Sequence, residues 1–142
     1  LLIATSLLIS QVGYYALAAQ VEPVCSSATK DGDTIVIPIK VVGDKGEVIE
    51  AWGFDINLKG LEYLACIKLG CLVEKSSSFI CNQFSSGKVR CGSFTGKLKI
   101  EGDHTLFKLE LKKKPHAKEV NIQLLNFVDH LASAQSSECE AK

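Results

Sequence analysis

Beyond residue 33, apolar residues recur at every second position, and this period constrains the fold more than any other feature of the sequence. Successive side chains of a β-strand point to opposite faces, so the period predicts strands with one buried face. Turn signals such as KDGD and SSGK separate these runs, and no sustained helical period follows residue 22. We expect an antiparallel sandwich in which Pro38 places its strand at an edge or a bulge. The predicted inward residues are Ile35, Ile37, Ile39, Val41, Trp52, Phe54, Ile56, Leu58, Phe107, Leu109, Leu111, Val120, Ile122 and Leu124.

Composition argues against several classes of function. The 142 residues include sixteen basic and sixteen acidic side chains, so the net charge is zero and nothing electrostatic favours a nucleic-acid partner. The sequence contains no Gly-rich phosphate loop, metal-ligand cluster or nucleophile elbow. We therefore expect no enzyme, no catalytic residues, no cofactor and no bound metal.

Six cysteines, an even number, indicate disulfides formed in an oxidising compartment. Zinc sites favour close pairs of cysteines, whereas even the closest pair here has four intervening residues. The stretch FICNQFSSGKVRC predicts a hairpin that turns at residues 85–87, with residue 81 opposite residue 91. Spacing leaves the connectivity open, and our preferred pairs are Cys81–Cys91, Cys66–Cys71 and Cys25–Cys139.

Five stretches follow one another in order: KDGDTIVIPIKV, EAWGFDINLKGLEYLA, SSGKVRCGSF, IEGDHTLFKLELKKK and VNIQLLNFVDHLA. Over about residues 21–132 this set resembles the cohesin domain. The resemblance implies a nine-stranded, jelly-roll-like sandwich whose first and last strands are neighbours. It also implies a dockerin partner that contacts the strand GFDINL, with Asp55 and Asn57 as candidate binding residues. Family members that bind dockerin often have Asn-x-Asp there, whereas this chain has Gly53 in place of the Asn.

The N-terminal segment carries no charge before Glu22 and has several interpretations. A secretory signal would fit its small residues near position 18, but a basic start is missing. As a helix, residues 1–19 would span about 28 Å, enough for a membrane anchor. A third interpretation is a helix packed in a filament core. A fourth inserts the segment as a donor strand into a neighbour's sheet.

The filament interpretation rests on small residues at helical spacing, Ser6, Ser10 and Gly13, with Leu17 one turn later. Such a stripe lets apolar helices approach closely. An apolar helix before a β-rich head looks like a type IV pilin of the archaeal kind. Bacterial pilins usually carry Glu at the fifth position, whereas this chain has Thr5.

We predict two parts, a hydrophobic helix over residues 1–20 and a cohesin-like sandwich head over residues 21–142. Exposed apolar surface costs about 25 cal/mol per Å², so the helix must be buried. The favoured function is a structural subunit of an extracellular filament, partnered by copies of itself and by the membrane before assembly. The alternative is a secreted or membrane-tethered cohesin module that binds a dockerin. The residues expected to pack in the filament core are Leu1, Leu2, Ile3, Ser6, Leu7, Leu8, Ser10, Gly13 and Leu17.

Overall fold

The computed structural model describes residues 20–43, 46, 48–49, 52–76, 78–93, 98–100, 104–128, 132–133 and 137–139. The nine residues predicted to pack in a filament core lie outside this set. The four interpretations of the N-terminal segment therefore stay predictions. Within the described part of the chain, no helix is long and apolar enough to cross a bilayer.

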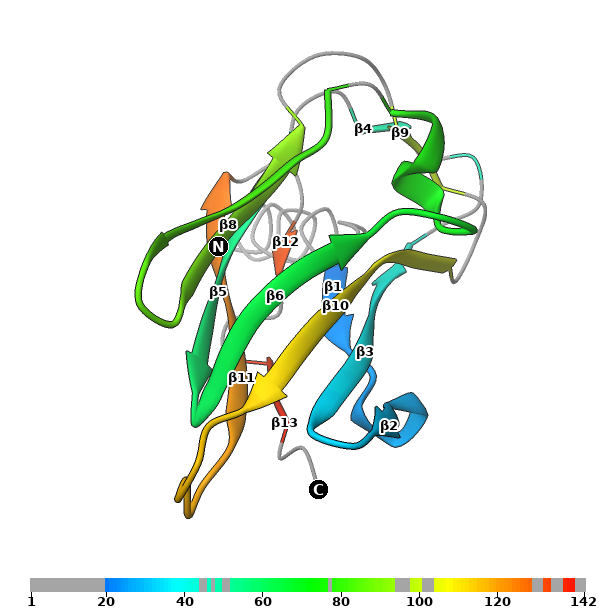
Figure 1. The fold of residues 1–142 in the computed structure, drawn as a ribbon. Coiled ribbons are helices and arrows are strands. Elements are labelled where there is room, and N and C mark those ends of the chain that lie inside the picture. The colour runs from blue at the N-terminus through cyan, green and yellow to red at the C-terminus, as the bar shows by residue number, and fades with distance from the viewer. Residues whose placement is uncertain are drawn as a thin grey trace, which may run out of the picture.

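The described residues form strands that stack as two sheets, with two short 3-10 helices, η1 (Cys25–Ser27) and η2 (Leu72–Lys75) (Figure 1). The strands are β1 (Gln20–Pro23), β2 (Thr29–Asp31), β3 (Thr34–Val42), β4 (Val48–Ile49), β5 (Trp52–Lys59), β6 (Leu61–Ile67), β7 (Ile80–Ser85), β8 (Lys88–Ser93), β9 (Leu98–Lys99), β10 (His104–Lys113), β11 (Asn121–Val128), β12 (Ala132–Ser133) and β13 (Ser137–Cys139).

The larger sheet has the order β12-β1-β3-β10-β6, with β2 also paired to β3, and the second has the order β13-β11-β5-β8-β7. Strands β4 and β9 form a separate ribbon. Among the described strands, every pair is antiparallel except β1 with β12. The predicted mainly β, antiparallel sandwich is confirmed. The described strands number thirteen rather than nine, because strands of two or three residues are too short to show an alternation in the sequence.

Inward side chains of the two sheets form one core, and twelve of the fourteen predicted inward residues are buried in it. Leu58 and Val120 pack against this core while partly exposed. Four aromatic rings form a closed cycle across the interior, with neighbouring centroids 5.2–6.0 Å apart. Trp52 and Phe54 come from β5, Phe107 comes from β10, and Phe79 precedes β7. The cycle therefore joins the two sheets.

Strand β10 departs from strict alternation at its start. Its pairing with β3 shifts between Thr105 and Phe107, which marks a β-bulge. As a result, Leu106 and Phe107 are consecutive in sequence and both fully buried. The bulge gives β10 one more core residue than its alternation predicts.

The predicted edge or bulge position of Pro38 is wrong. Strand β3 is internal, and Pro38 stands opposite Lys108 of β10 in regular register. On its other side, β1 pairs only as far as Ile39, and β2 begins pairing at Val36. Pro38 lacks an N–H to donate, but it lies in the gap between β1 and β2, where its carbonyl accepts a bond from Val24 N at 2.9 Å.

Replacing Phe107 with Ala should lower the free energy of unfolding by about 3–5 kcal/mol. Phe107 is fully buried, so its truncation leaves a cavity in the aromatic cycle, and this cavity causes the loss of stability. Urea denaturation measures the effect. The matched control is Phe84→Ala. The Phe84 ring is half exposed, so its removal should lower the free energy of unfolding by less than about 1 kcal/mol. Equal losses in the two variants would contradict the core position of Phe107.

Candidate functional site

The outward side chains of β5, β8 and β7 form one surface, which we term the outer face: Asp55, Asn57, Ile80, Asn82, Phe84 and Arg90. Alternation with buried Phe54 and Ile56 turns Asp55 and Asn57 outward, and alternation with buried Val89 and Cys91 does the same for Arg90. Strand register then aligns Asp55, Arg90 and Asn82 in one row across three strands.

A bidentate ion pair lies at the centre of the outer face. Arg90 Nε donates to Asp55 Oδ1 at 2.8 Å, and Arg90 Nη2 donates to Asp55 Oδ2 at 3.0 Å. The same guanidinium lies over the Phe84 ring, with Cζ 4.6 Å from the ring centroid. The hydrogen bond to Asp55 raises the pKa of Arg90. The planar guanidinium thus joins the carboxylate and the aromatic ring into one unit.

The chemistry of the outer face suits protein recognition. An ion pair at an exposed surface adds little to the stability of the fold, so stability explains little of the arrangement. The Arg90 side chain is 44% exposed, whereas that of Asp55 is 19% exposed, so the guanidinium is the more accessible group. Phe84 and Ile80 of β7 are about half exposed. Arginine and large apolar groups of this type are enriched at protein interfaces.

The predicted binding residues Asp55 and Asn57 both lie on the outer face, and their binding role stays a prediction. Sequence reasoning missed Arg90 and Phe84. Alternation along ICNQF puts Asn82 and Phe84 on one side of the strand and Cys81 on the other. If Cys81 faces the core, the alternation therefore turns Phe84 outward. The contact between Arg90 and Asp55 needs the pairing of β5 with β8, which no local signal reveals.

Gly53 of β5 stands opposite Gly92 in the β5–β8 ladder. The backbones approach closely there. A Cβ on Gly92 would lie 2.6 Å from the Trp52 carbonyl oxygen and 3.0 Å from the Gly53 Cα. Glycine at position 92 therefore permits the spacing of the two strands that carry Asp55 and Arg90.

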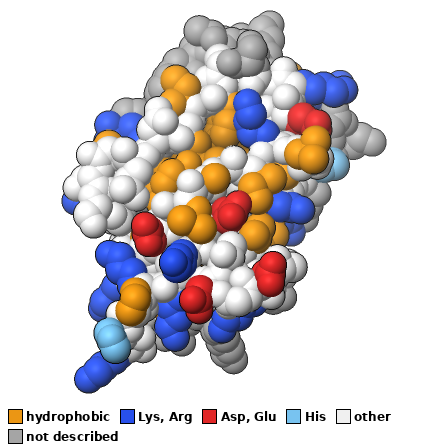
Figure 2. Space-filling view, viewed as in Figure 1, with side chains coloured by type: hydrophobic (Ala, Val, Ile, Leu, Met, Phe, Trp, Pro, Cys, Tyr) orange, Lys and Arg blue, Asp and Glu red, His pale blue; other side chains and the backbone are white. Residues whose placement is uncertain are grey.

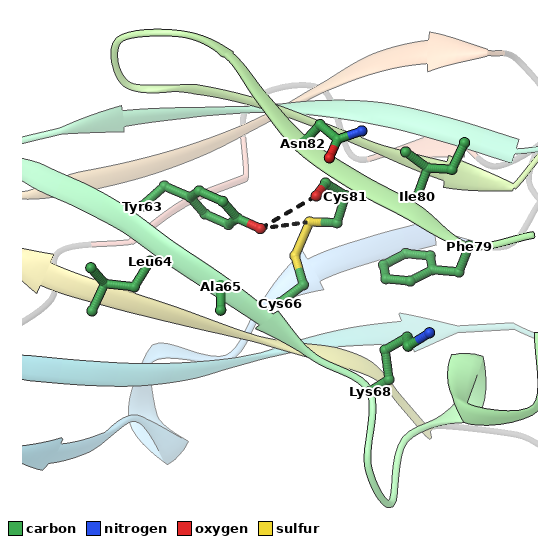
Figure 3. A pocket seen from close by; sticks show the side chains of 9 residues that line it. All are labelled: Tyr63, Leu64, Ala65, Cys66, Lys68, Phe79, Ile80, Cys81 and Asn82. Atoms are coloured by element: carbon green, nitrogen blue, oxygen red, sulfur yellow. Dashed lines mark hydrogen bonds between the residues drawn. A yellow bond between two sulfur atoms is a disulfide. The ribbon is translucent and has the colours of Figure 1, made fainter.

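A groove of about 430 Å³ lies between β6 and β7, the edge strands of the two sheets (Figure 3). Tyr63, Leu64 and Cys66 line it from β6, and Phe79, Ile80, Cys81 and Asn82 line it from the other side. Hydrophobic side chains gather on this face of the molecule (Figure 2). The Cys66–Cys81 disulfide joins the two edges covalently, and the Tyr63 hydroxyl donates to the Cys81 carbonyl at 3.4 Å.

The observed disulfide corrects the predicted connectivity. Cys81 does face Cys91 in the β7–β8 ladder, as the hairpin register predicts. However, Cys81 is bonded to Cys66, so the predicted Cys81–Cys91 and Cys66–Cys71 bonds are wrong. The reason is that β6 and β7 meet as sheet edges and bring Cys66 to Cys81. Cys25 is also in a disulfide; its predicted partner, Cys139, lies outside the side chains that the structure describes.

Two described cysteines keep free thiols. Cys91 is 1% exposed and Cys71 is 8% exposed. Burial raises the pKa of both thiols, and the negative charge of Asp55 adds to the rise for Cys91. The Cys66, Cys81 and Cys91 sulfurs lie within 4.8 Å of one another. Because these residues are widely spaced in the sequence, the sequence did not predict that their sulfurs lie together.

No family model and no curated protein matches this chain, but solved cohesin structures match its fold. The sixth cohesin of Acetivibrio cellulolyticus scaffoldin B, in complex with a Cel5 dockerin mutant, is 19% identical, with a TM-score of 0.59 over 77% of this chain and 81% of that one. CaCohA2 from Clostridium acetobutylicum is 17% identical, with a TM-score of 0.61 over 88% and 92%. The OlpA cohesin of Clostridium thermocellum, in complex with Doc918, is 14% identical, with a TM-score of 0.60 over 85% and 96%. The chain therefore has a cohesin-like β-sandwich fold.

Gly92→Ala should lower the free energy of unfolding by about 1–3 kcal/mol. The added Cβ would meet backbone atoms of β5, which cannot rotate away as a side chain can. Thermal unfolding followed by circular dichroism measures the change. Lys88→Ala, an exposed position on the same strand, should stay within about 0.5 kcal/mol of the parent. Parent-like stability of Gly92→Ala would refute the close approach of β5 and β8.

Proposed function

We propose that this chain is a non-catalytic recognition module that binds a dockerin-type protein through its outer face. The cohesin-like fold over most of the chain suggests the class of partner, and the Asp55–Arg90–Phe84 arrangement on the outer face carries the proposal. Several of the matching cohesins were solved in complex with dockerins. At 14–19% identity the likeness concerns the fold alone, so the outer face itself must supply the argument for binding.

The outer face has the composition of an interface centre. The Arg90 guanidinium donates two hydrogen bonds to Asp55 and packs against the face of the Phe84 ring, so both residues hold it in place. Pre-ordering a long side chain in this way reduces the entropy lost on binding. The amides of Asn82 and Asn57 flank this centre, as polar groups do at the rim of an interface.

Asp55 acts in this proposal by positioning Arg90. Its carboxylate is engaged by two hydrogen bonds from that residue. Gly53 supplies no side chain where dockerin-binding family members often have Asn. The partner should therefore recognise the Asp55–Arg90–Phe84 unit and not an Asn-x-Asp pair.

We also propose an extracellular or cell-surface location. The Cys66–Cys81 disulfide and the disulfide at Cys25 favour an oxidising compartment. A module with covalently joined sheet edges would resist unfolding there.

The test is calorimetric titration of the full chain with a panel of dockerins that includes the Cel5 and Doc918 modules, in calcium-containing buffer. Arg90→Ala and Phe84→Ala should each weaken binding by about 2 kcal/mol, roughly 30-fold in Kd. Asp55→Ala should also weaken binding, and the Asp55→Ala/Arg90→Ala double variant should lose no more than Arg90→Ala alone, because both changes remove one unit.

Matched controls are Leu69→Ala, another exposed apolar residue, and Glu110→Ala on β10 of the opposite sheet. Both should bind like the parent. Absence of binding to every dockerin in the panel would reject the dockerin partner. Equal weakening by Leu69→Ala and Phe84→Ala would reject the outer face as the binding surface.

A further inference from the structure

Three cysteine sulfurs meet beside the groove between β6 and β7. Cys66 and Cys81 share a disulfide, and the free Cys91 thiol lies 3.0 Å from Cys81 Sγ. Thiol–disulfide exchange needs a thiol in contact with one sulfur of a disulfide. This chain holds both reactants at one place, independently of any dockerin partner.

Backbone geometry accommodates either bond to Cys81. The Cys66 and Cys81 Cα atoms are 6.4 Å apart, inside the usual disulfide range of about 4.4–6.8 Å. Cys81 and Cys91 stand directly opposite each other on antiparallel strands, where Cα atoms are about 4.5–5.5 Å apart. The disulfide can therefore move between partners with little movement of the main chain.

We propose that Cys66, Cys81 and Cys91 form a disulfide-exchange site that makes Cys66 an attachment point for small thiol-containing molecules. The Cys91 thiol is 1% exposed, so it first loses its proton to water during a local opening of the sheet edge. The Cys91 thiolate then attacks Cys81 Sγ, the Cys81–Cys91 bond forms as the Cys66–Cys81 bond breaks, and Cys66 leaves as a thiolate. This step consumes no oxidant, because one disulfide replaces another.

Attachment follows when the Cys66 thiolate attacks a low-molecular-weight disulfide such as oxidised glutathione. A mixed disulfide forms on Cys66, and one glutathione leaves as its thiolate. The added disulfide is the oxidant of this second step, and one of its two halves is reduced.

Placement of the three residues favours this order of events. Cys66 and Cys81 line the groove, whereas Cys91 is 1% exposed. A reagent in the groove can thus reach Cys66 while the core shields Cys91. The groove volume of about 430 Å³ lies within the range of small-ligand sites, and Lys68 at its lining offers a positive charge to a carboxylate of the bound peptide. Burial raises the pKa of Cys91, which keeps the first step slow.

Peptide mapping tests the proposal directly, because trypsin places Cys66, Cys71, Cys81 and Cys91 on separate peptides: 60–68, 69–75, 76–88 and 91–97. The full-length chain is incubated with oxidised glutathione, quenched with acid, alkylated and digested without reduction. We expect glutathione on peptide 60–68, together with a new link between peptides 76–88 and 91–97. Before incubation, peptide 60–68 should be linked to peptide 76–88.

Cys91→Ser should abolish both products and keep the Cys66–Cys81 link. The control Cys71→Ser, which removes the other buried thiol, should give the same products as the parent. The proposal is overturned if the link between peptides 76–88 and 91–97 never appears, or if glutathione still attaches to Cys66 in Cys91→Ser. Purified parent protein with a stoichiometric metal ion on three reduced thiols would overturn it as well.

The Cys66→Ser variant provides a second test, which remains informative if Cys91→Ser misfolds. It leaves Cys81 and Cys91 as facing thiols, which oxidised glutathione should convert into a Cys81–Cys91 disulfide with release of two glutathione thiols. Persistence of both thiols would show that this pair cannot form the bond and would reject the exchange.

Discussion

The register of β7, β8 and β5 determines both surfaces of interest. Side chains alternate between the faces of a strand, so the ladder that turns Cys81 and Cys91 toward the core turns Asn82 and Arg90 outward. A slip of one residue in β8 would bury the Arg90 guanidinium away from Asp55 and expose the Cys91 thiol. An unpaired buried charge is strongly destabilising. The core on one side and the ion pair on the other therefore specify the same register.

Local patterns in the sequence were sufficient for the fold class. The period of two predicted the inward residues of β3, β5, β10 and β11, and the SSGK turn predicted the register that places Cys81 opposite Cys91. Relations between distant strands were not available from the sequence. Asp55 and Arg90 are 35 residues apart, and only the neighbourhood of β5 and β8 brings them together. Pro38 illustrates the same limit, because its missing N–H indicated a break in pairing but not that the break lies in the neighbouring strands.

The disulfide at Cys81 shows why correct register does not settle connectivity. Two sulfurs compete for Cys81, one from the facing strand β8 and one from β6, the edge of the other sheet. The hairpin in the sequence predicts that Cys91 lies opposite Cys81. It does not predict the approach of Cys66, because the meeting of two sheet edges is a property of the whole sandwich.

The two bonds open to Cys81 differ in what they hold together. The Cys66–Cys81 bond joins the two sheets, whereas a Cys81–Cys91 bond would lie within one sheet and leave the β7–β8 ladder unchanged. Exchange would therefore preserve the row of Asp55, Arg90 and Asn82 on the outer face while freeing β6 from β7. The groove and the outer face nevertheless share Ile80 and Asn82. A molecule attached at Cys66 would thus adjoin one edge of the outer face, and steric overlap there is the physical route by which attachment would influence the proposed partner binding.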